Sequence, residues 1–91
     1  MVNEPPLSPA QVRAARAWLS WSQEDLSIRS GVSHTSIARF ESERSVPYDG
    51  TLTNIRNALE AAGINFRFAG ALGTGISGPA FRQPKPTKPS R

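Results

Sequence analysis

Apolar residues recur at helical spacing through the first two thirds of the chain. Val12, Ala15 and Leu19 lie three and four residues apart, which is the spacing of one face of a helix. Just before them, Ser8 is a good N-cap and Gln11 stands at the third helical position, so the two form a capping box. The pattern predicts a first helix that begins directly after Ser8.

The same signals recur twice further along the chain. A cap at Ser22 predicts a short second helix, which Gly31 ends because glycine is a poor helix former. A cap at Ser33 predicts a third helix that buries Ile37 and Phe40, which lie three residues apart. Two short helices joined by a very short connection are therefore expected in the middle of the chain.

A fourth helix and a strand complete the pattern. We expect the helix to open at Thr51 and to stop at Gly63. Beyond it, Ile64, Phe66 and Phe68 alternate with polar or small residues, which is the spacing of a strand. The apolar face of the fourth helix comprises Leu52, Ile55, Leu59 and Ala62.

The chain of 91 residues accommodates one small domain. We expect a flexible arm over residues 1–6, the domain over 7–68, and a mobile, basic tail rich in glycine and proline over 69–91. The glycines of the tail could return Ile76–Phe81 toward the strand. The fold class predicted is all-α, with four to five compact helices, a short C-terminal strand or hairpin, and a flexible tail.

The net charge of +4 belongs to the end of the chain. Met1–Phe66 carries six basic and seven acidic residues, a balance of −1, whereas Arg67–Arg91 carries five basic residues and no acid, a balance of +5. Lys85, Lys88 and Arg91 could add nonspecific phosphate contacts. A nucleic-acid role for the domain must therefore rest on where its charges point.

Several classes of protein are disfavoured by the composition. The chain has no cysteine and one histidine, which argues against a disulfide framework, a metal site or a catalytic His34. No apolar run approaches the roughly 18 residues of a membrane span. The N-terminus lacks the basic segment followed by an apolar segment that is typical of a signal peptide. Gly73–Gly78 spells G-x-G-x-x-G, but Pro79 follows where a dinucleotide site needs a helix. We expect a soluble, cytoplasmic protein without enzymatic activity, cofactor or membrane partner.

The connection Gly31-Val32-Ser33 is the most informative feature of the sequence. A three-residue turn sets the third helix across the second, and Gly31 can supply the positive φ that such a corner needs. A helix held in this way can project its N-terminal residues into a DNA major groove. Its outward residues would be His34, Thr35, Ala38, Arg39 and Ser42, with Ser36 on the flank.

Residues Gln23 to Pro47 (QEDLSIRSGVSHTSIARFESERSVP) resemble the helix-turn-helix of the Cro and phage-repressor family, also called the XRE family. With Arg16 upstream and Leu52…Ile55…Leu59 downstream, the resemblance covers roughly Leu7 to Ile64 and implies a repressor-like domain. The shared elements are Gln23, Leu26, Gly31-Val32-Ser33, Ile37, Phe40-Glu41 and the Arg44…Pro47 segment.

The resemblance implies a role for each matching residue. By resemblance, Arg16 of the first helix pairs with Glu41 late in the third, and the position of Arg16 within an apolar stripe favours a partly buried pair over two solvated charges. The implied DNA contacts are Gln23 to the backbone, His34, Thr35 and Arg39 to bases, Ser36 near a phosphate, and Arg44 to a phosphate.

Two residues depart from the family pattern. Ser27 stands where the family usually has alanine, so its hydroxyl must find a partner or tilt the packing. Glu43 stands where a glycine commonly ends the recognition helix, which predicts either a longer helix or a strained loop. Glu43 also brings a negative charge near the expected path of the phosphates.

Four aromatic and apolar residues are candidates for an interface. Trp18 lies beside the core stripe of the first helix, so it either packs on the predicted strand or belongs to an interface. Ile64, Phe66 and Phe68 offer an apolar face that a second copy or a partner strand could cover.

The leading functional hypothesis is a sequence-specific, DNA-binding transcriptional regulator, either a repressor or an antitoxin-like autoregulator. Its partner would be double-stranded DNA, and since one recognition helix covers only a half-site, the chain would bind as a homodimer. The alternative is an antiactivator or antitoxin that uses the same fold to sequester a partner protein. The charge balance of −1 over Met1–Phe66 and the apolar strand motivate this alternative.

Overall fold

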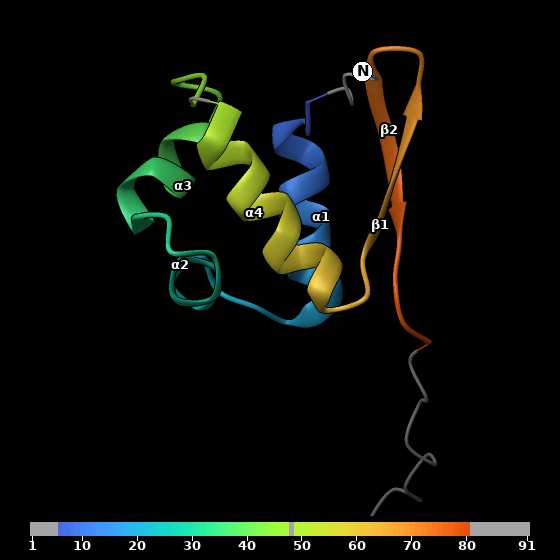
Figure 1. The fold of residues 1–91 in the computed structure, drawn as a ribbon, viewed down its shortest axis with the longest axis horizontal. Coiled ribbons are helices and arrows are strands. Elements are labelled where there is room, and N and C mark those ends of the chain that lie inside the picture. The colour runs from blue at the N-terminus through green and yellow to red at the C-terminus, as the bar shows by residue number, and fades with distance from the viewer. Residues whose placement is uncertain (1–5, 48, 81–91) are drawn as a thin grey trace, which may run out of the picture.

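The computed structural model describes residues 6–47 and 49–80 and contains four helices followed by a two-stranded hairpin (Figure 1). The helices pack together in one cluster, and the hairpin lies beside α1. The elements are α1 (Pro9–Leu19), α2 (Gln23–Ser30), α3 (His34–Glu41), α4 (Asp49–Ala61), β1 (Asn65–Ala69) and β2 (Leu72–Ser77).

The three predicted N-caps are confirmed. The Ser8 hydroxyl accepts from the Gln11 amide at 3.1 Å, and the Gln11 side chain accepts from the Ser8 amide at 2.9 Å. Ser22 and Asp25 form the same capping box at the start of α2. Hydrogen bonding with the backbone amide and the side chain of Ser22 lowers the pKa of Asp25. Ser33 caps α3 by accepting from the amide three residues on at 3.2 Å. Local sequence thus determines where these three helices begin, whereas α4 begins at Asp49, two residues before the expected start at Thr51.

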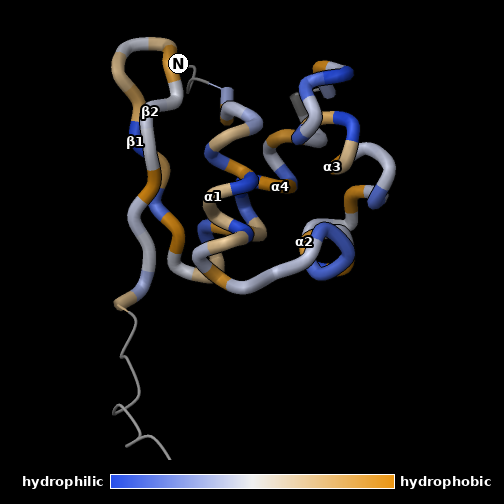
Figure 2. The backbone as a smooth tube through the Cα atoms, turned by 180° about the vertical axis from the view of Figure 1, so that it is seen from behind, coloured by the Kyte–Doolittle hydropathy of each residue, from blue (hydrophilic) through white to orange (hydrophobic). Residues whose placement is uncertain are grey.

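The core lies between the four helices and the start of the hairpin. Most of its residues are those that the helical spacing predicted, with one buried stripe on each helix. In Figure 2 hydrophobic and hydrophilic positions alternate along every helix, as expected for helices that each bury one face. The core residues are Leu7, Val12, Ala15, Leu26, Val32, Ile37, Phe40, Ile55, Leu59 and Ile64.

The hairpin confirms the expected short C-terminal strand or hairpin and corrects the all-α class, because the fold contains a two-stranded sheet beside its helices. β1 pairs with β2 in antiparallel register, with Asn65 opposite Ser77 and Ala69 opposite Leu72, and an irregularity follows Arg67. Regular structure therefore continues to Ser77, into the 69–91 segment that we expected as a tail. Residues 1–5 of the expected arm and 81–91 of the expected tail lie outside the described residues.

The three apolar residues of the predicted strand are buried or half-buried. Ile64 precedes β1 and is only 1% exposed, so the expectation that it offers an interface is wrong; it belongs to the core. Phe66 and Phe68 are half-buried, and the Arg56 guanidinium of α4 stacks over their rings at 5.9 and 5.4 Å. Both rings also pack against the apolar core.

One buried polar side chain fastens the hairpin to the helices. Gln11, 3% exposed, donates from Nε2 to the backbone carbonyls of Arg67 in β1 and Gly75 in β2, at 2.8 and 3.0 Å. At Gly73 a Cβ atom would lie 2.0 Å from Gln11 Oε1, so the strand backbone can approach only because this residue is glycine. Gln11 therefore caps α1 and also holds both strands.

Helix α3 ends in a left-handed turn built on Glu43. The helix does not run on: Ser42 is its C-cap, and Glu43 adopts φ 63°. The Glu43 amide donates to Phe40 O at 2.9 Å and the Arg44 amide donates to Arg39 O at 2.8 Å, which is the Schellman pattern. The predicted strain thus lies in one residue, because a glycine motif is made here with a Cβ present.

We expect Gln11→Ala to lower the free energy of unfolding by about 2–3 kcal/mol, because it removes the side-chain acceptor of the Ser8 amide and leaves two strand carbonyls without their donor. Ser8→Ala is the matched control, since it removes the other half of the capping box, leaves the strand contacts in place and should cost about 1 kcal/mol. Urea unfolding of both variants measures the difference. Equal losses would show that Gln11 contributes nothing through the hairpin.

We expect Glu43→Gly to raise the free energy of unfolding by about 0.5–1 kcal/mol, because glycine relieves the left-handed conformation at the cost of a more flexible unfolded chain. Ser45→Gly, in the same loop at a position without positive φ, should give no gain. Thermal melting distinguishes the two variants, and a destabilised Glu43→Gly protein would contradict the assignment of strain to this residue.

Candidate nucleic-acid interface

The corner between α2 and α3 is built by three residues. Gly31 ends α2 with φ 74°, as its sequence position predicted, and its amide donates to Ser27 O at 2.9 Å. Val32 is 7% exposed and anchors the corner in the core. The hydroxyl of Ser27 donates to Val32 O at 2.6 Å, so this departure from the family pattern finds its partner within the turn. The corner is therefore held by the burial of Val32 and by hydrogen bonds to Ser27 of α2.

Helix α3 divides its residues between the core and solvent. Ile37 is fully buried and Phe40 is 5% exposed. On the opposite side His34, Thr35 and Arg39 are exposed. The helix therefore presents a polar N-terminal turn and a cation one turn later to solvent.

The other predicted contact residues lie beside this face. Ser36 is half-buried, and its hydroxyl accepts from that of Ser33 at 2.9 Å within the helix cap. Gln23 is half-buried at the start of α2, and Arg44 is exposed in the loop after α3. Phosphate contacts from these positions would orient α3, whereas base contacts would come from α3 itself.

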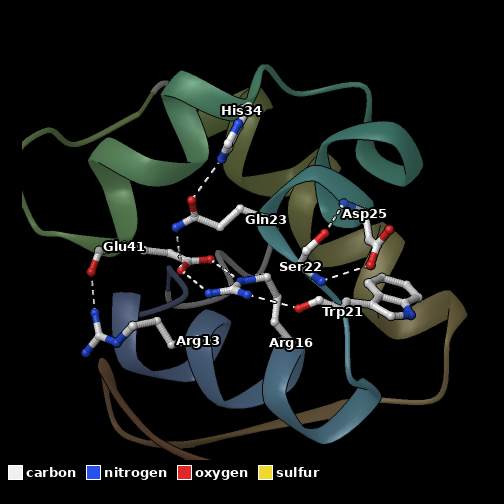
Figure 3. Close-up of polar contacts among 8 residues, drawn as sticks. All are labelled: Arg13, Arg16, Trp21, Ser22, Gln23, Asp25, His34 and Glu41. Carbon is white, nitrogen blue, oxygen red and sulfur yellow. Dashed lines mark hydrogen bonds and ion pairs between the residues drawn. The ribbon is translucent and has the colours of Figure 1, made fainter.

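A buried ion pair joins α1 to α3. Arg16 donates from Nη2 and Nε to the two carboxylate oxygens of Glu41 at 2.6 and 2.7 Å, a bidentate arrangement (Figure 3). The Glu41 side chain is 3% exposed and that of Arg16 19% exposed, which matches the partly buried pair favoured from the sequence. The hydrogen bond with Glu41 raises the pKa of Arg16; burial opposes this and the charge of Glu41 adds to it.

The ion pair continues to the surface through Gln23. Its Nε2 donates to Glu41 Oε1 at 3.1 Å, and its Oε1 lies 3.0 Å from His34 Nε2. Figure 3 shows this line of contacts, which runs from Arg16 of α1 through Glu41 and Gln23 to His34, the first residue of α3. Two predicted DNA-contacting residues are therefore tied to the structural pair Arg16 and Glu41.

Sequence reasoning missed two contacts around the pair. Arg13 Nη1 donates to the backbone carbonyl of Glu41, and Arg16 Nη1 donates to that of Trp21 at 3.0 Å. Arg13 lies one turn before Arg16 on α1, and this spacing is the signal that could have revealed it. Both α1 arginines thus support the C-terminal end of α3.

Trp18 lies against the end of the hairpin. Its Nε1 donates to Pro79 O at 3.2 Å, and a Cβ atom at Gly78 would lie 2.5 Å from the indole. The side chain is nevertheless 48% exposed. These contacts are to the segment that follows β2, and not to the Ile64–Phe68 strand on which we expected Trp18 to pack; the interface alternative stays a prediction.

Within 6–47 and 49–80 no group of three or more His, Asp or Glu residues could hold a metal ion. None of the described helices is both long and apolar enough to cross a membrane.

The arrangement of α2, the short corner and α3 is that of a helix-turn-helix domain. A family model described as Helix-turn-helix matches residues 12–64, more than half of the chain. The protein therefore belongs to this helix-turn-helix family, as the resemblance to Cro and the phage repressors predicted, and the family is a DNA-binding regulatory domain rather than an enzyme family. No curated protein matches the chain.

We expect Glu41→Gln to lower the free energy of unfolding by about 3 kcal/mol, because it leaves the buried Arg16 guanidinium without its carboxylate. Glu60→Gln is the matched control: Glu60 pairs with Arg56 within α4, but its side chain is 41% exposed, so the loss should be about 0.5 kcal/mol or less. Chemical unfolding of both variants measures the contrast. Similar losses would mean that burial adds nothing to the Arg16–Glu41 pair.

Proposed function

We propose that the protein is a sequence-specific, DNA-binding transcriptional regulator that inserts α3 into the major groove. The observation that carries this proposal is the exposed, polar N-terminal turn of a helix whose opposite face is locked in the core. His34, Thr35 and Arg39 supply the base contacts, while Gln23 and Arg44 hold the phosphate backbone. A repressor or an antitoxin-like autoregulator is the role that we favour.

The regulator acts as a homodimer on DNA. One α3 spans only a half-site, and two copies related by a two-fold axis read half-sites separated by about one helical turn, roughly 34 Å. The operator is then a pseudo-palindrome, which can be recognised in sequences selected from a random pool of duplexes.

A second function is supported by the charge balance. Met1–Phe66 carries six basic and seven acidic residues, which is −1, although DNA-binding surfaces are usually strongly positive. Ile28 on α2 and Val46 after α3 are large apolar side chains that are 75% and 91% exposed. These features favour an antiactivator or antitoxin that sequesters a partner protein, with or without DNA binding.

One titration separates the two functions. The full chain is titrated with the selected operator and with random duplex DNA, each at low and at moderate salt. Tighter binding to the operator at moderate salt is the result expected of a regulator, because nonspecific binding weakens steeply with salt. No retained complex at either salt would overturn the proposed function and leave the protein-sequestering role.

We expect Arg39→Ala to weaken operator binding by about 1–3 kcal/mol and to relax the preference for one base pair, because it removes a contact to a base edge. Arg67→Ala is the matched control: it removes the same charge from an exposed position on the hairpin, which lies on the far side of α1 from α3 (Figure 1). Fluorescence anisotropy on the operator and on single-base variants measures both effects.

Equal weakening by Arg39→Ala on every duplex would assign Arg39 to phosphate alone. Equal weakening by the two variants would show that only the net charge of the chain matters.

A further inference from the structure

The carboxylate of Glu41 determines which way the Gln23 amide faces. A carboxylate only accepts hydrogen bonds, so the group of Gln23 that lies 3.1 Å from Glu41 Oε1 must be the NH2 group. The amide oxygen then faces His34 Nε2 at 3.0 Å. Reversing the amide would set two oxygens against each other at Glu41, inside the network that holds Arg16.

The orientation of Gln23 in turn determines the proton on His34. An amide oxygen only accepts, so the ring nitrogen that faces it must carry hydrogen. In the neutral imidazole one nitrogen carries hydrogen and the other accepts. With hydrogen on Nε2, Nδ1 is the acceptor, and within 6–47 and 49–80 no other group hydrogen-bonds the exposed ring.

We propose that Glu41, acting through Gln23, holds His34 as the Nε2–H tautomer, so that the first residue of the recognition helix presents a hydrogen-bond acceptor to the DNA. Gln23 is thus a positioning residue as well as a backbone contact, and His34 selects a base. The base-selecting part rests on the proposed function, whereas the tautomer is a property of the free protein.

The acceptor specifies a class of base. In the major groove adenine N6 and cytosine N4 carry amino groups that donate, whereas guanine and thymine offer acceptors at the corresponding edges. Neutral His34 therefore favours adenine or cytosine over guanine or thymine on the strand that it faces. A single neutral hydrogen bond of this kind corresponds to a preference of about fivefold.

The first experiment measures the tautomer without DNA. Long-range ¹H–¹⁵N NMR at alkaline pH, where the ring is neutral, distinguishes the protonated ring nitrogen, and the chain has only one histidine to assign. We expect one Nε2–H form in the full chain and a shift toward the mixture of a free histidine peptide in Gln23→Met. Thermal melting verifies that this variant folds. An Nδ1–H form, or identical spectra for the two proteins, would overturn the proposal.

The second experiment measures base selection. Each base pair of the selected operator is varied in turn, and binding is compared for the full chain and His34→Lys, whose ammonium only donates. At the base pair that responds, the preferred base on one strand should change from adenine or cytosine for the full chain to guanine or thymine for His34→Lys. Specific binding with a preference for guanine there in the full chain would refute this inference alone, whereas loss of all specific binding would refute the proposed function and the base selection together.

Discussion

The hydrogen bonding of the Glu41 carboxylate is the interaction on which the arrangement of α3 depends. The carboxylate is nearly inaccessible to water, so its charge is tolerated only because donors from two other helices reach it. The bidentate contact of Arg16 ties it to α1, and the amide of Gln23 ties it to α2. The backbone carbonyl of Glu41 is held as well, by Arg13. The last turn of α3 is therefore fixed by directed contacts, whereas apolar packing alone permits small rotations.

Gln11 orients the hairpin through hydrogen bonds, as Glu41 orients α3. A domain this small buries few large side chains, and β2 contributes little apolar surface because glycine alternates along it. The hairpin is held instead by hydrogen bonds from one amide to a carbonyl of each strand, and by the rings of β1 under Arg56. Two polar side chains thus orient the two parts of the molecule that surround the apolar core.

The sequence predicted what local chemistry determines. Caps at Ser8, Ser22 and Ser33 and the positive φ of Gly31 follow from neighbours a few residues away, and the inward face of α3 follows from helical spacing. The pairing of Arg16 with Glu41 came from the family resemblance. The second role of Gln11 could not be predicted, because its partners lie 56 and 64 residues away. Strand β2 was hard to locate because a glycine-rich strand carries no apolar alternation, and alternation alone could not tell that Ile64 is core.

The glycines of the C-terminal segment differ in how much mutation each can tolerate. Gly73 and Gly78 have no room for even a methyl group, because a Cβ atom would collide with Gln11 and with the Trp18 indole, whereas Gly75 faces open space. Alanine at Gly73 would require the Gln11 amide to leave its strand carbonyls, and alanine at Gly78 would require the indole to move, although neither glycine is buried. The glycines of this segment are therefore not interchangeable, and drift among related chains would be confined to Gly75, because Gly70, which also touches nothing, has a φ of 60° that a side chain would strain.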